Sequence, residues 1–263
     1  MHKYRQIEYK AGATIEIIKC IPWSCRQGAQ KGEKKKSREE IRKANMVQAA
    51  RKLTRKLNAN FRPGDWHVIL TYKDVPDVQT AKKYLDKFLQ RLRTAYRKMA
   101  GELKYIAVTE FKAKRIHHHL VINRINDGKK TAADLVREIW RKLGQGNPKF
   151  VPLYDSGEYQ GLAEYLIKET ERTFRDMENP WKQRFSCSRN LVEPKKTVET
   201  KKIKNAWEMD PKPRKGYYIQ PDSLYNGFDL MGYQYQRYVL VKINPTESDW
   251  EQPKARRRRK RNM

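Results

Sequence analysis

The chain has 263 residues, a length that suits one or two domains with proper hydrophobic cores. Lysine and arginine number 59 against 30 aspartate and glutamate residues, so the formal net charge at pH 7 is +29. Such a charge disfavours basic partners and favours polyanions, with nucleic acid first and anionic membrane surfaces second. Apolar residues at 38% and aromatic residues at 11% argue against a wholly disordered basic chain.

The sequence gives no sign of a membrane segment or a disulfide framework. No apolar run approaches the ~18 residues of a transmembrane helix, and the first ten residues lack the apolar core of a signal peptide. Cys20, Cys25 and Cys187 are an odd number and show no paired spacing. We therefore expect a cytoplasmic protein without membrane contact.

The N-terminal part predicts a hairpin followed by a basic helix. Alternating apolar residues in the first thirty positions are typical of a short hairpin. Ser37 and Glu40 have the spacing of a capping box, and the helix that they begin should run to about Leu57. Its basic residues, among them Arg51 and Arg55, either form a solvated face or contact nucleic-acid phosphates. Few acidic residues follow Glu40 to balance them, which favours phosphate contact.

The middle of the chain predicts a mixed α+β domain. The order of elements is strand, helix, strand, strand, helix, strand and helix. This order closes as a ferredoxin-like or RRM-like antiparallel sheet of the βαββαβ type, with helices on one face and the other face free for a ligand. The strands are expected at 66–72, 103–110, 116–123 and 149–153, and the helices at about 77–100, 131–143 and 160–173.

Composition suggests four parts along the chain. These are the hairpin and helix of residues 1–60, the α+β domain of 61–180, an aromatic-rich extension of 181–250 and a polybasic tail of 251–263. The tail has almost no apolar residues and is expected to be disordered. The aromatic residues of the extension either stack on unpaired bases or form the core of a small second sheet. They are Tyr217, Tyr218, Tyr233, Tyr235 and Tyr238.

The run Arg115 to Ile122 carries the strongest chemical signal. On a strand, His117 and His119 point to the same face, and His118 points to the other. Glu110 ends the preceding strand, and a short turn should bring its carboxylate beside His117. Two imidazoles and one carboxylate can bind a divalent metal and leave positions open. The alternatives are a merely polar sheet face and a non-haem iron oxygenase site, and the basic charge argues against the oxygenase.

A tyrosine and a lysine lie on the helix that follows. Tyr165 and Lys168 are three residues apart and share a helix face. A phenol has a pKa near ~10 and is a poor nucleophile at neutral pH without help. A metal that polarises a phosphate and a nearby ammonium group both supply such help. The plainer interpretation of Tyr165 is an aromatic residue packed in the core.

Three motifs in this order resemble those of the HUH superfamily of rolling-circle replication initiators. The run from Val68 to Tyr72 is similar to the family's first motif, a strand that ends in Leu-Thr-Tyr. His117, His118 and His119 resemble the HUH motif itself, although an aliphatic residue is more usual at the middle place. Tyr165 to Lys168 is similar to the third motif. The resemblance implies that residues 61–180 form an HUH-like endonuclease domain with a single catalytic tyrosine.

The resemblance also implies an activity and its cofactor. His117, His119 and Glu110 would bind Mn²⁺ or Mg²⁺, and Tyr165, aided by Lys168, would nick single-stranded DNA at an origin hairpin. The product would be a 5′-phosphotyrosine intermediate that starts rolling-circle replication. No ATPase phosphate-binding loop occurs, so a separate helicase and DNA polymerase are expected as partners. Further DNA contacts are expected from a basic set that consists of Arg115, Lys114, Arg189, Arg51 and Arg55.

Two other functions stay open at this point. A relaxase or a single-tyrosine transposase would use the same tyrosine chemistry. A non-catalytic basic protein could bind single-stranded DNA or RNA with the histidines incidental, and loss of Tyr165 would then leave its nucleic-acid binding intact.

Overall fold

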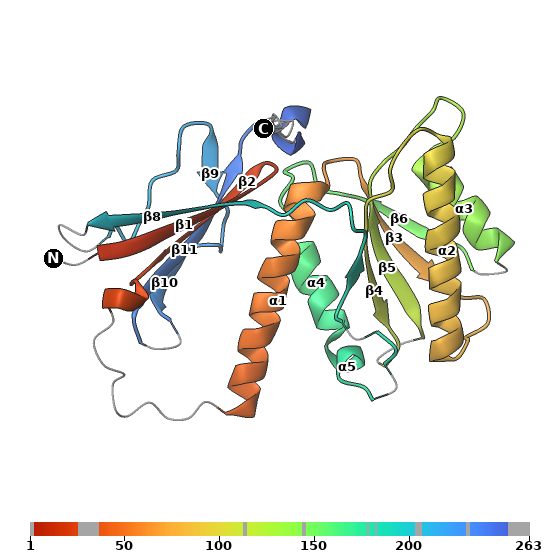
Figure 1. Cartoon of the computed structure of the whole chain (residues 1–263), viewed down its shortest axis with the longest axis horizontal. Coiled ribbons are helices and arrows are strands. Elements are labelled where there is room, and N and C mark those ends of the chain that lie inside the picture. The colour runs from red at the N-terminus through yellow and green to blue at the C-terminus, as the bar shows by residue number, and fades with distance from the viewer. Residues whose placement is uncertain are drawn as a thin grey trace, which may run out of the picture.

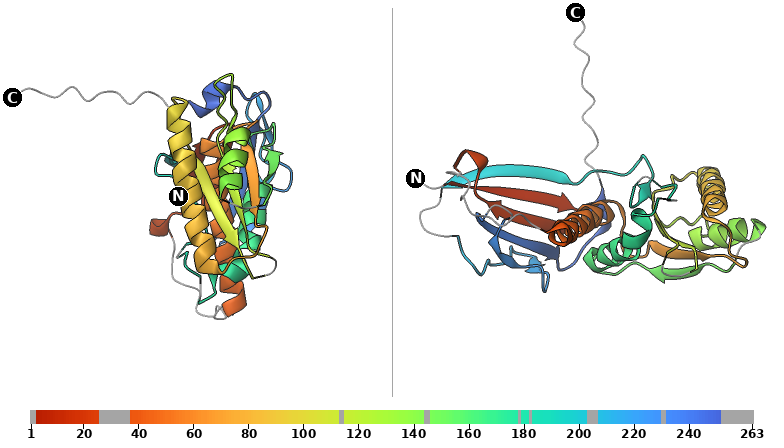
Figure 2. Two further views of the ribbon diagram at one scale, coloured as in Figure 1. Left: turned by 90° about the vertical axis from the view of Figure 1, so that its right-hand side faces the viewer. Right: turned by 90° about the horizontal axis from the view of Figure 1, so that it is seen from below.

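The computed structural model describes residues 3–25, 37–112, 115–143, 146–177, 179–181, 183–202, 207–229 and 232–251. The molecule is elongated, with one β-sheet toward each end (Figures 1 and 2). Helices α1 (Arg38–Asn60) and α4 (Gln160–Glu169) lie between the two sheets. Within the described ranges, no helix combines the length and the apolar character needed to cross a membrane. The predicted basic tail falls outside these ranges after Glu251.

One sheet, which we call the motif sheet, contains the strands of the first two sequence motifs, β3 and β5, and has the order β6-β3-β5-β4-β7. Each neighbouring pair in it is antiparallel. Numbered along the chain, its first four strands therefore lie in the order 4-1-3-2, so the predicted ferredoxin-like plan is confirmed. The elements are β3 (Trp66–Thr71), α2 (Val78–Lys98), β4 (Tyr105–Glu110), β5 (His117–Ile122), α3 (Ala132–Lys142), β6 (Lys149–Pro152) and β7 (Ser186–Cys187).

Helices α2 and α3 cover one face of the motif sheet. Both begin at side-chain caps, because Asp77 accepts a hydrogen bond from the backbone of Thr80 and Thr131 forms a capping box with Asp134. Their apolar residues recur at helical spacing and pack on the alternate residues of β3 and β5. The buried contacts include Val68, Leu70, Leu120 and Ile122 of the strands and Leu85, Phe88, Leu92 and Trp140 of the helices.

The opposite face of the motif sheet is also covered, although we expected it to be free for a ligand. Helices α1 and α4 pack against it, and the predicted helix of 160–173 is divided into α4 and the short α5 (Glu171–Phe174). The cause is a second apolar stripe, because Ile106 and Val108 of β4 and Val121 of β5 also point to this face, beside Glu110, His117 and His119. This core contains Leu53 and Leu57 of α1, Leu162 and Leu166 of α4, and Ile106, Val108 and Val121 of the sheet.

The other sheet, which we call the terminal sheet, contains strands from the N-terminal and the C-terminal parts of the chain. Its order is β10-β11-β2-β1-β8, and β9 also pairs with β11. The predicted hairpin lies at its centre, so this one sheet includes strands from both residues 1–60 and residues 181–250. Its elements are β1 (Lys3–Ala11), β2 (Thr14–Cys20), β8 (Lys195–Lys202), β9 (Tyr217–Ile219), β10 (Tyr225–Phe228) and β11 (Gln234–Lys242), and the 3-10 helices η1 (Trp23–Cys25) and η2 (Glu247–Trp250) lie outside it.

Some of the C-terminal aromatic residues form the core of a second sheet, one of the two roles considered for them. Tyr238 is buried with Ile15, Ile17 and Leu240, and Tyr217 packs against this cluster, which is the core of the terminal sheet. Tyr218 keeps 36% of its surface exposed. A second sheet with a core of its own is therefore present, and the stacking of bases on the exposed tyrosines stays a prediction.

A buried carboxylate connects the terminal sheet to α1. Glu16 of β2 forms ion pairs with Arg55 of α1 and with Arg237 of β11. Burial by itself would raise the pKa of Glu16, but the hydrogen bond from Arg55 and the charges of both arginines lower it below its ordinary value. The Trp250 indole N–H also donates to the backbone oxygen of Asn58, at 2.8 Å. These contacts hold α1 between the two sheets.

Candidate metal and tyrosine site

The two motif histidines face each other at one end of β5. The register places Glu110 of β4 and Thr71 of β3 on either side of His117. His117 and His119 share a face of the strand, and their Nε2 atoms lie 3.0 Å apart. Two ligands at right angles around a cation with metal–nitrogen bonds of about 2.1 Å are separated by about 3 Å. The spacing of the two Nε2 atoms therefore fits a shared divalent cation.

The hydrogen bonds behind these rings suit metal binding. Nδ1 of His117 lies 2.8 Å from the backbone oxygen of Arg115, which can only accept, so Nδ1 carries the proton and Nε2 keeps its lone pair. Nδ1 of His119 lies 3.1 Å from Nε2 of His67 on β3. Burial lowers the pKa of His67 to about 4, so at neutral pH this ring is uncharged and its Nε2 can accept a hydrogen bond from Nδ1–H of His119.

Glu110 is fully buried and close to the pair, but on its far side. Its Oε2 atom lies 3.5 Å from Nδ1 of His117, whereas Nε2 of His117 is the atom that faces His119. Among the described residues, no group of three or more His, Cys, Asp or Glu side chains has the arrangement of a metal site. The structure thus brings the predicted ligands together, and Glu110 as a third ligand stays a prediction that needs its carboxylate to turn toward Nε2.

Tyr165 lies directly against the histidine pair. Its ring meets the His119 ring edge to face, with the centroids 5.4 Å apart, and it keeps 39% of its surface exposed. Lys168 follows on the same helix and is exposed. Tyr159 is fully buried at the start of α4, and burial raises its pKa well above the ordinary value. Tyr165 is therefore accessible to a substrate beside the histidines, and Tyr159 is not.

The middle histidine has a different role. His118 points to the core between the sheet and helices α2 and α3, and it is fully buried. Its Nε2 lies 2.6 Å from the Tyr72 hydroxyl, and its Nδ1 lies 2.8 Å from the Thr109 hydroxyl. Burial, with a smaller effect of His117, lowers the pKa of His118 to about 3. A polar residue is tolerated at this place because both ring nitrogens are paired with hydroxyl groups.

An open groove of about 480 Å³ adjoins the histidines. It is lined by His117, Thr71, Tyr72, Ile116 and Arg115. The Arg115 guanidinium donates to the backbone oxygen of Lys73 at 3.0 Å, which holds this charge at the groove. A groove lined by His117 and by the cation of Arg115 can accept a phosphate group.

Of the other predicted DNA contacts, the three that the structure describes do not lie at this site. Lys114 falls outside the described residues. Arg51 is half-buried beside the terminal sheet and donates to the Tyr235 hydroxyl at 3.4 Å. Arg55 stacks on the Tyr9 ring and pairs with Glu16, so it is occupied within the fold. Arg189 lines a separate groove at the other end of the motif sheet.

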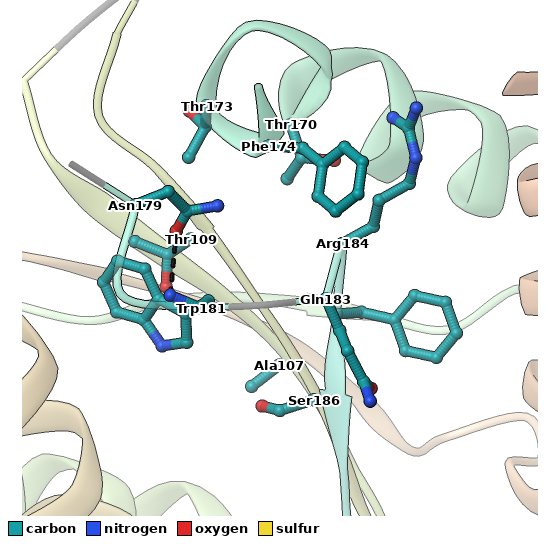
Figure 3. A pocket seen from close by; sticks show the side chains of 11 residues that line it. Ala107, Thr109, Thr170, Thr173, Phe174, Asn179, Trp181, Gln183, Arg184 and Ser186 are labelled. Atoms are coloured by element: carbon teal, nitrogen blue, oxygen red, sulfur yellow. Dashed lines mark hydrogen bonds between the residues drawn. The ribbon is translucent and has the colours of Figure 1, made fainter. Parts of the chain in front are cut away.

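The chain segment after α5 closes the edge of β4 behind the site. Figure 3 shows Asn179 and Trp181 beside Thr109, and Arg184 beside Phe174 of α5. The cavity that they leave has a volume of about 10 Å³, enough for one water molecule and too little for a substrate. Arg184 pairs with the buried Glu171. Trp181 of this region packs against His118, so the region supports the histidine strand.

His67 is the site residue that sequence reasoning missed. It looked like a single polar residue in an apolar strand. The signal was in the alternation, because Trp66, Val68 and Leu70 all point to the α2 and α3 core. His67 therefore had to point to the face of His117 and His119.

Comparison with known proteins supports the assignment of the central domain. Residues 65–171 match the family model of the replication-associated protein ORF2. The match spans less than half of the chain and includes His67, Glu110, both motif histidines and Tyr165. Searches of curated proteins and of solved structures each found no significant match. The family match supports a Rep-type protein with a general role in the initiation of replication.

Proposed function

We propose that this chain is a metal-dependent endonuclease and strand transferase that nicks single-stranded DNA at a replication origin. The observation that carries the proposal is the contact of Tyr165, an exposed tyrosine, with His119 of the histidine pair. The family match to replication-associated proteins makes DNA the expected substrate. In this proposal the enzyme starts rolling-circle replication and uses one catalytic tyrosine.

His117 and His119, with Glu110 as the third ligand, would hold Mn²⁺ or Mg²⁺, which when bound polarises the scissile phosphate. The two imidazoles offer convergent Nε2 atoms, and the buried carboxylate contributes negative charge. Arg115 lines the groove at His117 and would bind a phosphate oxygen of the same DNA strand.

The covalent step is a transesterification at phosphorus. The Tyr165 oxygen attacks, the bond between phosphorus and the 3′-oxygen breaks, and a 5′-phosphotyrosine bond forms. The phenol gives up its proton to solvent, and the departing 3′-oxygen takes one up, so protons and charge balance. The ammonium of Lys168 favours the phenolate form of Tyr165. The free 3′-hydroxyl then serves as a primer for a separate DNA polymerase, with a separate helicase to unwind the duplex.

The test is a covalent adduct that survives denaturation. Wild-type protein, incubated with Mn²⁺ and a mixed-sequence pool of single-stranded DNA, should give a band that resists SDS and is lost with EDTA. Tyr165→Phe should abolish the band. Tyr154→Phe is the matched control, because Tyr154 is an exposed tyrosine of the same region that does not contact the histidines, and its band should persist. An adduct of normal yield in Tyr165→Phe would refute the assigned nucleophile. No adduct with any metal, together with DNA binding that is indifferent to metal, would favour a non-catalytic binding protein.

A further inference from the structure

A second basic groove, of about 610 Å³, lies at the end of the motif sheet remote from the histidines. Tyr105, the first residue of β4, lines it, whereas Glu110 at the other end of β4 pairs with His117. Three arginines line the groove, Arg93, Arg97 and Arg189. We call it the arginine groove. The site at Tyr165 leaves these three residues without a role.

The three guanidinium groups come from two elements that the fold fixes side by side. Arg93 and Arg97 lie one turn apart on α2 and therefore share a helix face. The residues on either side of Arg189 form hydrogen bonds with the start of β4 and with the residues just before it. Ser188 and Tyr105 exchange two hydrogen bonds of 3.0 Å, and the Asn190 side chain donates to the backbone oxygen of Leu103 at 3.3 Å. Little ordering of the backbone is then needed when a ligand binds.

The charge in the arginine groove is not balanced within the fold. In the part of the chain that the structure describes, none of the three arginines has an ion-pair partner. The acidic residue of the lining is Glu102, and the Asn190 side chain donates to its carboxylate at 3.3 Å. Arg55 and Arg237, by contrast, are paired with the buried Glu16. The groove therefore presents net positive charge to solvent.

We propose that the arginine groove binds the phosphodiester backbone of DNA at a place separate from Tyr165. Guanidinium groups present planar pairs of N–H donors that match phosphate oxygens. The five-residue rise from Tyr105 to Glu110 separates the groove from the histidine end by ~17 Å along the strand. At ~3.4 Å per nucleotide, this length corresponds to about five nucleotides or more of bound strand. The choice of DNA as the ligand rests on the proposed function, whereas the contact itself sets the position of the DNA and does not depend on the nicking chemistry.

The test compares two triple variants of the full chain with equal loss of charge. The first variant combines Arg93→Gln, Arg97→Gln and Arg189→Gln and removes the three positive charges of the groove. Lys83→Gln with Lys87→Gln and Arg91→Gln removes three exposed charges on another face of the same helix α2 and is the matched control. Fluorescence anisotropy measures the affinity for a labelled hairpin oligonucleotide with a single-stranded arm, in a series of salt concentrations without metal.

The groove variant should lower the slope of log affinity against log salt by about 2, because each phosphate contact contributes ~0.7–0.9. The control variant should change this slope by less than about 1, because it weakens only the overall positive potential of the protein and removes no phosphate contact. Equal changes in the two variants would overturn the proposal. Arg189→Gln alone, expected to lower the slope by roughly 0.7–0.9, gives the same test if the triple variant unfolds. Because the assay measures DNA binding without metal, a negative result would contradict the groove proposal alone. It would say nothing about whether Tyr165 nicks DNA.

Discussion

His67 should control how tightly the histidine pair binds metal. For Nε2 of His119 to ligate a cation, Nδ1 of the same ring must carry the proton. The Nε2 atom of His67 lies 3.1 Å from this Nδ1 and accepts its hydrogen bond. We consider His67→Phe, which keeps a ring in the buried position but cannot accept a hydrogen bond, and His67→Gln, whose side-chain oxygen can.

The expected loss follows from the role of partners behind metal-bound histidines, which typically contribute about 10–100-fold in metal affinity. His67 is 7% exposed, so solvent cannot replace the missing acceptor, and we expect His67→Phe to weaken Mn²⁺ binding by about 30-fold. That loss corresponds to about 2 kcal/mol. His67→Gln should recover most of it.

Isothermal titration calorimetry with Mn²⁺ measures this effect without reference to nicking. His117→Ala gives the value for a lost ligand, and thermal unfolding shows whether each variant keeps its stability. Wild-type affinity in a folded His67→Phe protein would refute the reasoning, because His119 would then need no acceptor. Absence of Mn²⁺ binding in the wild type would instead contradict the metal site itself.

Two further predictions concern the fold. Glu16→Gln should destabilise the protein by about 3 kcal/mol at pH 7, because it leaves the buried Arg237 and the half-buried Arg55 uncompensated. The lowered pKa of Glu16 means that its contribution is present above its unfolded pKa and is lost as pH falls through the folded value, so urea titrations should show variant and wild type converging in acid. Gly12→Ala should cost about 3 kcal/mol, since φ is +54° and the new Cβ would lie 2.2 Å from the backbone oxygen of Asn58. Gly128→Ala, at φ +84° with nothing within 4 Å, is its control and should cost only about 1 kcal/mol in thermal unfolding.

The sequence predicted the motif sheet well because its signals are local. Strand alternation, helix periodicity and the caps at Ser37, Asp77 and Thr131 each lie within a few residues of the element that they define. The same reasoning placed His117 and His119 on one face and Glu110 next to them, as the register shows.

What the sequence did not show depends on contacts between distant residues. Strand β8 has an almost wholly polar sequence and is mostly exposed, as suits a lysine-rich edge strand, so it has no apolar alternation to detect. Arg55 of α1 looked available for phosphate because its partner, Glu16, lies on strand β2, far away in the sequence. The cover of α1 and α4 on the motif sheet likewise depends on tertiary packing.

The central claim is that Tyr165 becomes joined to DNA, and peptide mapping of the adduct tests it most directly. Trypsin should release residues 150–168 as one peptide that contains Tyr154, Tyr159 and Tyr165. After nuclease digestion of the adduct, tandem mass spectrometry locates the nucleotide that stays attached. We predict a 5′-nucleotide on Tyr165 and on neither of the other two tyrosines. A nucleotide on Tyr154, on Tyr159 or on a residue outside this peptide would contradict the proposed site.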